Sequence, residues 1–157
     1  MTRAQPNPEE RLRELGIELP AAPKPLAAYV PAVRAGDLVF ISGQGPLKDG
    51  QVVWAGQVGA DLSVEEGREA ARLAVINALA ALKQEVGSLD RVVRMVKLVG
   101  WVNSAAGFYQ QPQVINGASE LLEEVFGERG RHARSAVAAH TLPLNFAVEI
   151  ELIAQVQ

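Results

Sequence analysis

The sequence predicts a single α+β domain in which two helices cover one face of a mixed β-sheet. Two long helical segments are interspersed with shorter segments rich in β-branched residues, which is the pattern of helices laid on a sheet. Apolar residues make up 48% of the chain but aromatic residues only 5%, so small aliphatic side chains must fill the core and allow close packing. A chain of 157 residues is long enough for one core of this kind.

The N-terminal part is predicted to be an extension, residues 1–25, that precedes a domain of residues 26–157. Residues 8–16 carry the pattern of a short helix that ends at a glycine. Three closely spaced prolines follow it: Pro20, Pro23 and Pro25. Proline biases the residue before it toward extended geometry, so this stretch is expected to be a linker on the domain surface.

The first part of the domain predicts three strands in a meander. Residues 28–33 and 37–44 are short β-rich segments separated by a turn-like interval. The pair Asp49-Gly50 favours a turn with positive φ, and a third strand is expected near Val52–Trp54.

Two helices are predicted after the meander. Ser63 and Glu66 match a capping box, which starts a helix over residues 64–86. The second helix is expected over residues 112–126, where apolar residues recur on one side. Gly117 lies inside this helix and is expected to weaken it.

Three further strands are predicted over residues 91–102, 133–139 and 146–156, which completes the order βββ-α-β-α-ββ. Along the last strand apolar residues alternate with Glu149 and Glu151. Because the helices cover one face of the sheet, we expect oligomerisation to cover the other.

Composition narrows the possible functions. The net charge is −3 and the basic residues are scattered, so neither nucleic acid nor a membrane is expected as a partner. No apolar run approaches the ~18 residues of a membrane span, and the chain is expected in the cytoplasm. There are no cysteines, His132 and His140 have no acidic residue at metal-ligand spacing between them, and no phosphate-binding glycine motif occurs. Neither a metal nor an organic cofactor is therefore expected.

Three segments of the chain contain residues that could carry chemistry. Arg134 starts a strand after a loop, where a guanidinium could bind a carboxylate through two hydrogen bonds, although a structural salt bridge explains it as well. Glu149 and Glu151 lie on the same side of the last strand and are either catalytic, at an interface or paired with a basic residue. Ser42-Gly43 ends an apolar strand, where the backbone could meet a ligand or simply turn.

Together with Tyr29 and Asn116, four segments resemble the RidA (YjgF) family in order and spacing. They are Val39–Gln44, Ala133–Ser135, Leu142–Pro143 and Val148–Glu151. The resemblance covers roughly residues 26–155. It implies a chorismate-mutase-like trimer whose three sheets form a central core and whose ligand sites lie in the clefts between subunits.

The resemblance also implies a reaction and a set of site residues. The arginine matching Arg134 binds the substrate carboxylate, and the glutamate matching Glu149 helps to position the attacking water. The other residues that match the family pocket are Tyr29, Ser42, Gly43 and Asn116. The implied activity is hydrolytic deamination of small enamines or imines derived from amino acids, such as 2-aminoacrylate, with release of ammonia and a 2-keto acid.

Two alternatives remain at the level of sequence. The chain departs from many family members by having Ala136 in place of cysteine and Leu144 in place of lysine, and by its longer N-terminal part. A trimer that binds small carboxylates or partner proteins without catalysis is therefore one alternative. An endoribonuclease is the other, although the net charge and the few aromatic residues provide neither a phosphate track nor a stacking surface.

Overall fold

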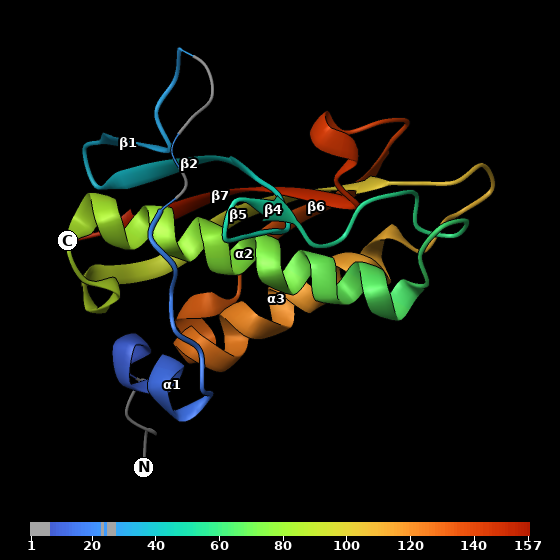
Figure 1. The fold of residues 1–157 in the computed structure, drawn as a ribbon. Coiled ribbons are helices and arrows are strands. Elements are labelled where there is room, and N and C mark those ends of the chain that lie inside the picture. The colour runs from blue at the N-terminus through green and yellow to red at the C-terminus, as the bar shows by residue number, and fades with distance from the viewer. Residues whose placement is uncertain (1–6, 23, 25–27) are drawn as a thin grey trace.

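The core of the fold is a five-stranded sheet with two long helices on one side (Figure 1). The computed structural model describes residues 7–22, 24 and 28–157. The strand order is β1-β2-β7-β5-β6. The elements are β1 (Ala32–Ala35), β2 (Leu38–Gln44), α2 (Val64–Val86), β5 (Val92–Asn103), α3 (Gln111–Phe126), β6 (Ala133–Ala139) and β7 (Val148–Val156). The predicted α+β class is confirmed.

The sheet is mixed because one of its strand pairs is parallel. Strands β5 and β6 run parallel and are joined through α3, whereas β1 with β2, β2 with β7, and β5 with β7 are antiparallel. A parallel pair needs such a crossover connection, which places α3 against the sheet. The predicted helices and the last three predicted strands match the structure within two residues at each end.

The opening strands differ from the prediction in two respects. The first strand begins at Ala32 instead of residue 28, and Pro31, which has no N–H to donate, directly precedes it. The predicted third strand does not join the sheet; β3 (Leu47–Lys48) and β4 (Gln51–Val52) form a separate hairpin. The side-chain amide of Asn77 on α2 donates to Leu47 O at 2.9 Å and thereby holds the start of this hairpin on the helix.

The two turn signals were read correctly from the sequence. Asp49 and Gly50 have φ of 51° and 76°, as an Asp-Gly hairpin turn requires. The Ser63 hydroxyl accepts from the backbone N–H of Glu66, whose carboxylate accepts from the backbone N–H of Ser63, so the capping box is present. Helix α2 therefore begins where the sequence predicts.

Glycines allow α3 to approach its neighbours closely. A Cβ built on Gly117 would collide with the backbone carbonyl of Arg68 on α2, and one built on Gly100 would lie 2.5 Å from Cδ1 of Ile115. Gly117 does reduce helix propensity, as expected. It is nevertheless required, because any larger residue would push the two helices apart.

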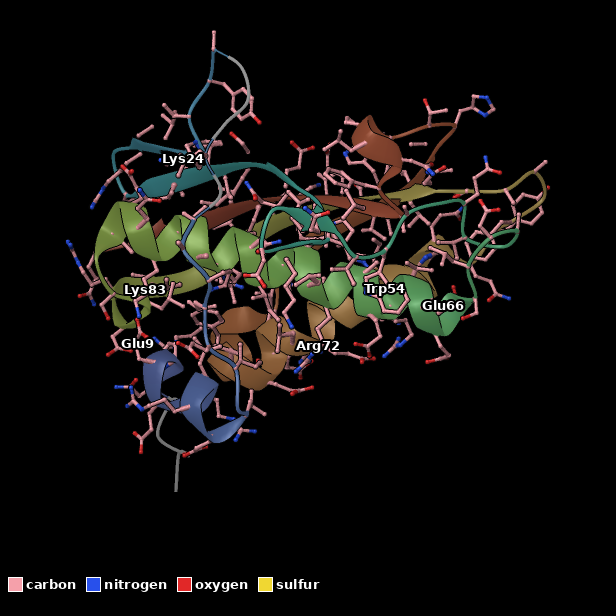
Figure 2. The ribbon with its side chains drawn as sticks, in the orientation of Figure 1. Glu9, Lys24, Trp54, Glu66, Arg72 and Lys83 are labelled. Atoms are coloured by element: carbon pink, nitrogen blue, oxygen red, sulfur yellow. The ribbon has the colours of Figure 1, made fainter. Side chains whose placement is uncertain are left out.

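Helix α1 (Pro8–Glu14) is fixed to the C-terminal ends of the two long helices. Leu12 is 3% exposed and belongs to the core. The carboxylate of Glu9 lies 3.0 Å from Nζ of Lys83 and also accepts from the backbone N–H of Leu89 at 3.0 Å (Figure 2). These hydrogen bonds and the ion pair with Lys83 hold the pKa of the Glu9 carboxyl below its ordinary value despite the opposing effect of burial.

Among the described residues, no long helix covers the other face of the sheet, which is called the open face below. Both long helices lie on the same side of the sheet in Figure 1. Strand register places three exposed apolar side chains on the opposite side: Val33 at 52%, Phe40 at 43% and Val137 at 38% exposure. Glu149 and Glu151 share this face. The open face therefore combines apolar surface with two acidic groups.

Candidate functional site

Arg134 lies on the helix-covered side of the sheet, close to α3. It pairs with Leu98 in the parallel register of β5 and β6, and Leu98 is fully buried beneath the helices. Neighbouring residues in register point to the same face, so the guanidinium points toward α3. There Nη1 donates to Oδ1 of Asn116 at 2.7 Å and to Oγ of Ser119 at 3.2 Å.

The guanidinium borders an open pocket of about 300 Å³ between α3 and the start of β6. Its lining includes Asn116, Ser119, Glu123, Arg131, His132 and Arg134. Helix α3 supplies the first three of these, and the segment from η2 (Gly127–Gly130) into β6 supplies the others. The pocket is therefore polar and carries charges of both signs.

Arg134 has no ion-pair partner among the described residues. The basic residues of the salt bridges found there are Arg11, Arg68, Lys83 and Arg131. Partial burial lowers the pKa of Arg134, yet a guanidinium remains charged in proteins. The structural salt bridge considered for Arg134 is absent from the described chain. A partly buried cation of this kind favours an anionic ligand.

Glu149 and Gly43 form a second group, on the open face. Glu149 pairs with Trp101 of β5, while Gly43 lies in the irregular end of β2. A Cβ on Gly43 would lie 2.9 Å from Oε2 of Glu149, so only a glycine allows the carboxylate to rest against the backbone of β2. Burial, and then the neighbouring charge of Glu151, raise the pKa of Glu149. No salt bridge of Glu149 occurs among the described residues, so the basic partner considered for it is not found there.

Ser42 directly precedes Gly43, and its hydrogen bonds bring the segment that follows Tyr29 to the same end of β2. The Ser42 hydroxyl donates to Val30 O at 2.7 Å, and its backbone N–H donates to Pro31 O at 2.9 Å. These two bonds hold the segment before β1 on the end of β2. Tyr29, one residue earlier, is 52% exposed. Ser42 therefore has a structural role as well as its predicted place in the pocket.

The two groups lie on opposite faces of the same sheet. Arg134 is in register with Leu98 and Glu149 with Trp101, and the register of β5 is regular between these two residues. Side chains three apart on a strand point in opposite directions. A single chain therefore brings Arg134 to Asn116, and Glu149 to Gly43, but does not bring Arg134 to Glu149.

Neither a metal site nor a membrane span is found in the part of the chain that the structure describes. No group of three or more His, Asp or Glu side chains there is arranged to hold a metal ion. Among the same residues, no helix combines the length and the apolar character needed to cross a bilayer.

Comparison with known proteins assigns the chain to a family. The model of the family described as "YjgF/chorismate_mutase-like, putative endoribonuclease" matches residues 9–156. The chain belongs to the YjgF family. The curated protein TCP17 of Trypanosoma cruzi is 45% identical over 145 residues, which are 92% of this chain and 91% of that protein. The resemblance inferred from sequence is thereby confirmed.

Two solved structures of similar length share the fold of this YjgF protein. A "putative endoribonuclease" from Shewanella oneidensis MR-1 is 40% identical with a TM-score of 0.93, and the match covers 96% of this chain and 99% of that one. The protein Atu1372 of Agrobacterium tumefaciens, described as of unknown function, is 44% identical with a TM-score of 0.90, covering 96% and 92% of the two chains.

Sequence reasoning missed two residues of this YjgF protein that contact the site. Ser119 and His132 lie beside Arg134, with Ser119 Oγ 2.9 Å from Nε2 of His132. Ser119 follows Asn116 by three positions, a spacing that places both on one helix face, so helical periodicity could have identified it. His132 was considered as a metal ligand but not named as a neighbour of Arg134. Its contact with α3 depends on tertiary packing that no local pattern encodes.

Proposed function

We propose that the protein hydrolyses small enamines or imines that carry a carboxylate, such as 2-aminoacrylate or its imine tautomer. The products would be ammonia and a 2-keto acid. The observation that carries this proposal is the guanidinium of Arg134, which borders an open pocket and has no ion-pair partner among the described residues. Such a group selects a ligand with an anionic end.

The chemistry needs one anchored end and one activated water. Arg134 would hold the carboxylate and so fix the C=N carbon, which lowers the entropic part of the barrier. Glu149 would accept a proton from water as the oxygen bonds to that carbon, and its raised pKa suits a base that works near neutral pH. Glu149 would pass this proton to the imine nitrogen, which gives a carbinolamine. The hydroxyl proton of the carbinolamine would then move to the nitrogen as the C–N bond breaks, so that the C=O of the 2-keto acid forms and ammonia leaves. No cofactor is required by this scheme.

The proposal includes a homotrimer, because Arg134 and Glu149 of one chain point away from each other. The exposed apolar side chains of the open face favour its burial against further copies. In such an assembly, the Glu149 group of one copy would face the Arg134 group of the next copy. Tyr29, Ser42 and Gly43 would then contribute from the Glu149 side and Asn116 from the Arg134 side.

The activity is tested by generating imines enzymatically and measuring release of the 2-keto acid. We expect the wild type to accelerate release and the Arg134→Ala and Glu149→Gln variants to lose the effect. His140→Asn is the matched control, since His140 lies outside both groups of residues. A wild type that binds small carboxylates but never accelerates release would exclude the deaminase.

Complementation tests whether the site is shared between copies. Arg134→Ala and Glu149→Gln chains are denatured together and refolded as mixed assemblies. At some of the mixed interfaces, the intact Arg134 of a Glu149→Gln chain would face the intact Glu149 of an Arg134→Ala chain. Part of the activity should therefore return. A mixture that stays as inactive as either parent, although mass spectrometry shows mixed oligomers, would contradict a shared site.

One alternative is a carboxylate-binding protein without catalysis. It is favoured by the separation of the two groups, because the pocket beside Arg134 lies wholly within one chain and needs no Glu149. It predicts ligand binding that Arg134→Ala abolishes and Glu149→Gln leaves unchanged, with no turnover by the wild type.

A second alternative is an endoribonuclease. The descriptions of the family and of the Shewanella oneidensis protein both contain this word. The net charge of −3 does not favour binding of a polyanion. Cleavage of RNA by protein freed of contaminating nucleases, and its loss in Arg134→Ala, would establish this activity instead.

A further inference from the structure

A chain of hydrogen bonds links Arg134 through Ser119 and His132 to Gly130. The donor and acceptor atoms of these residues determine which way each hydrogen bond points. The Gly130 carbonyl can only accept, so Nδ1 of His132, which lies 2.7 Å from it, carries the proton. In a neutral imidazole the other nitrogen is then an acceptor. Nε2 of His132 therefore accepts from the hydroxyl of Ser119 at 2.9 Å. The oxygen of that hydroxyl in turn accepts from Nη1 of Arg134 at 3.2 Å.

The surroundings keep His132 neutral. Burial lowers the pKa of His132, and the charge of Arg134 acts in the same direction. The hydrogen bond to Gly130 and the charge of Glu123 oppose this shift without reversing it. The other pocket charges are compensated locally, because Glu120 forms a salt bridge with Arg68 and Arg131 lies 3.7 Å from Glu128.

This arrangement engages one edge of the guanidinium and leaves the other edge available. Nη1 has two hydrogens, and these go to Oδ1 of Asn116 and Oγ of Ser119. Nε and Nη2 make no hydrogen bond to any described residue. Nε–H and one Nη2–H point the same way and form the fork that matches the two oxygens of a carboxylate.

We propose that Ser119 and His132 are positioning residues, which lock the guanidinium of Arg134 so that its Nε/Nη2 edge is presented to the ligand carboxylate. Asn116 alone could hold Nη1 but would leave the guanidinium free to rotate about its last torsions. Ser119 adds a second anchor, and His132 fixes the direction of that hydroxyl. This inference rests on the proposed carboxylate recognition by Arg134 and does not depend on turnover.

Ligand affinity provides the first test. The probe is 2-oxobutyrate, titrated by NMR, with 2-butanone as the analogue that lacks the carboxylate. We expect Ser119→Ala and His132→Phe each to weaken binding of 2-oxobutyrate about fivefold, Ser119→Thr to restore it, and His140→Asn to leave it unchanged. Wild-type affinity in Ser119→Ala would overturn the positioning role while leaving the deaminase proposal intact.

A double-mutant cycle separates positioning from general support of the fold. In the Arg134→Ala background, removal of the Ser119 hydroxyl should have no further effect on the residual affinity, because the group it positions is gone. An undiminished loss in that background would show that Ser119 acts through the fold, and would overturn the inference. Binding by the wild type without any imine turnover would instead contradict only the proposed function.

The tautomer of His132 gives a readout that needs no ligand. The ¹⁵N shifts of its imidazole, assigned with the help of His140→Asn, should show the proton on Nδ1 in the wild type at neutral pH. A proton on Nε2, or on both nitrogens, would overturn the hydrogen-bond direction on which the inference depends. In Ser119→Ala the Nδ1–H bond to Gly130 should persist, because it does not involve Ser119.

Discussion

The charge of Arg134, beside Asn116 and Ser119, and the charge of Glu149, beside Gly43, have different surroundings. Polar side chains of α3 hold Arg134, and its Nη1 has two hydrogen-bond partners. Glu149 lies against the bare backbone of Gly43, and its pKa is raised by burial and by Glu151. A charge held by donors and acceptors is suited to recognition, because its direction is fixed. A carboxylate that is partly desolvated and unpaired is suited to proton transfer, because its ionised form is less stable.

The largest expected effect comes from removing the recognising charge. Arg134→Ala should reduce kcat/KM for imines by about 100-fold or more, because two charge-assisted hydrogen bonds to the substrate carboxylate are lost. The melting temperature should change little, since Arg134 forms no ion pair among the described residues. Steady-state kinetics and thermal melts test both parts. Equal turnover of a carboxylate-bearing and a carboxylate-free imine by the wild type would refute recognition by Arg134.

A smaller effect is expected from filling the space beside Glu149. In Gly43→Ala the new methyl group would lie 2.9 Å from Oε2 of Glu149, so the carboxylate must move. Turnover should fall about tenfold, while binding of 2-oxobutyrate to the Arg134 side stays within about twofold.

The matched control, Glu149→Asp, shortens the side chain that carries the carboxylate by one methylene group. Adding Gly43→Ala to Glu149→Asp should have little further effect, because the shorter side chain leaves room for the methyl group. If Gly43→Ala lowered turnover of Glu149→Asp about as much as it lowers turnover of the wild type, Gly43 would be required for the backbone conformation of β2 and not for the position of the carboxylate.

The pH dependence of turnover should report the raised pKa of Glu149. A general base must be ionised, so activity should be lost as pH falls through a pKa above the ordinary glutamate value of 4.5. Glu151→Gln removes the charge that helps to raise this pKa and should move the acid limb of the profile to lower pH. An acid limb that stays in place in Glu151→Gln would argue against coupling of the two carboxylates.

The smallest expected effect is on stability, and it concerns the Glu149 carboxyl. Because folding raises the pKa of Glu149, the protonated carboxyl is favoured in the folded state. Its stabilisation is complete below the unfolded pKa and disappears as pH rises through the folded one. Glu149→Gln should therefore raise the melting temperature at pH 7 by roughly 1–3 °C and have no such advantage near pH 3. A variant less stable than the wild type at pH 7 would contradict the unfavourable burial of this charge.

Local signals predicted most of the fold. The capping box of Ser63 and Glu66 located the start of α2, and the Asp49-Gly50 pair located the β3–β4 turn. Such signals act within a few residues and depend little on the rest of the chain. The third strand of the meander was misplaced because Asn77, some 30 positions further along, holds the hairpin start on α2.

The candidate site was predictable as a list of residues but not as an arrangement. Asn116 was expected in the same pocket as Arg134, and the two are hydrogen-bonded at 2.7 Å. The opposite orientation of Arg134 and Glu149 depends on the register of β5 with two different strands, which a sequence pattern does not encode. His132 was missed for the same reason, since its partner Ser119 lies on a separate element.

The opposed faces of the sheet have a consequence for enzyme kinetics. If each catalytic centre is shared between two copies, a separated protomer keeps every residue and still lacks a centre. Specific activity should then decline on dilution below the dissociation constant of the assembly, and product formation should change from first to higher order in protein. The subunit equilibrium would thus set an upper limit on activity at low expression, independently of substrate supply.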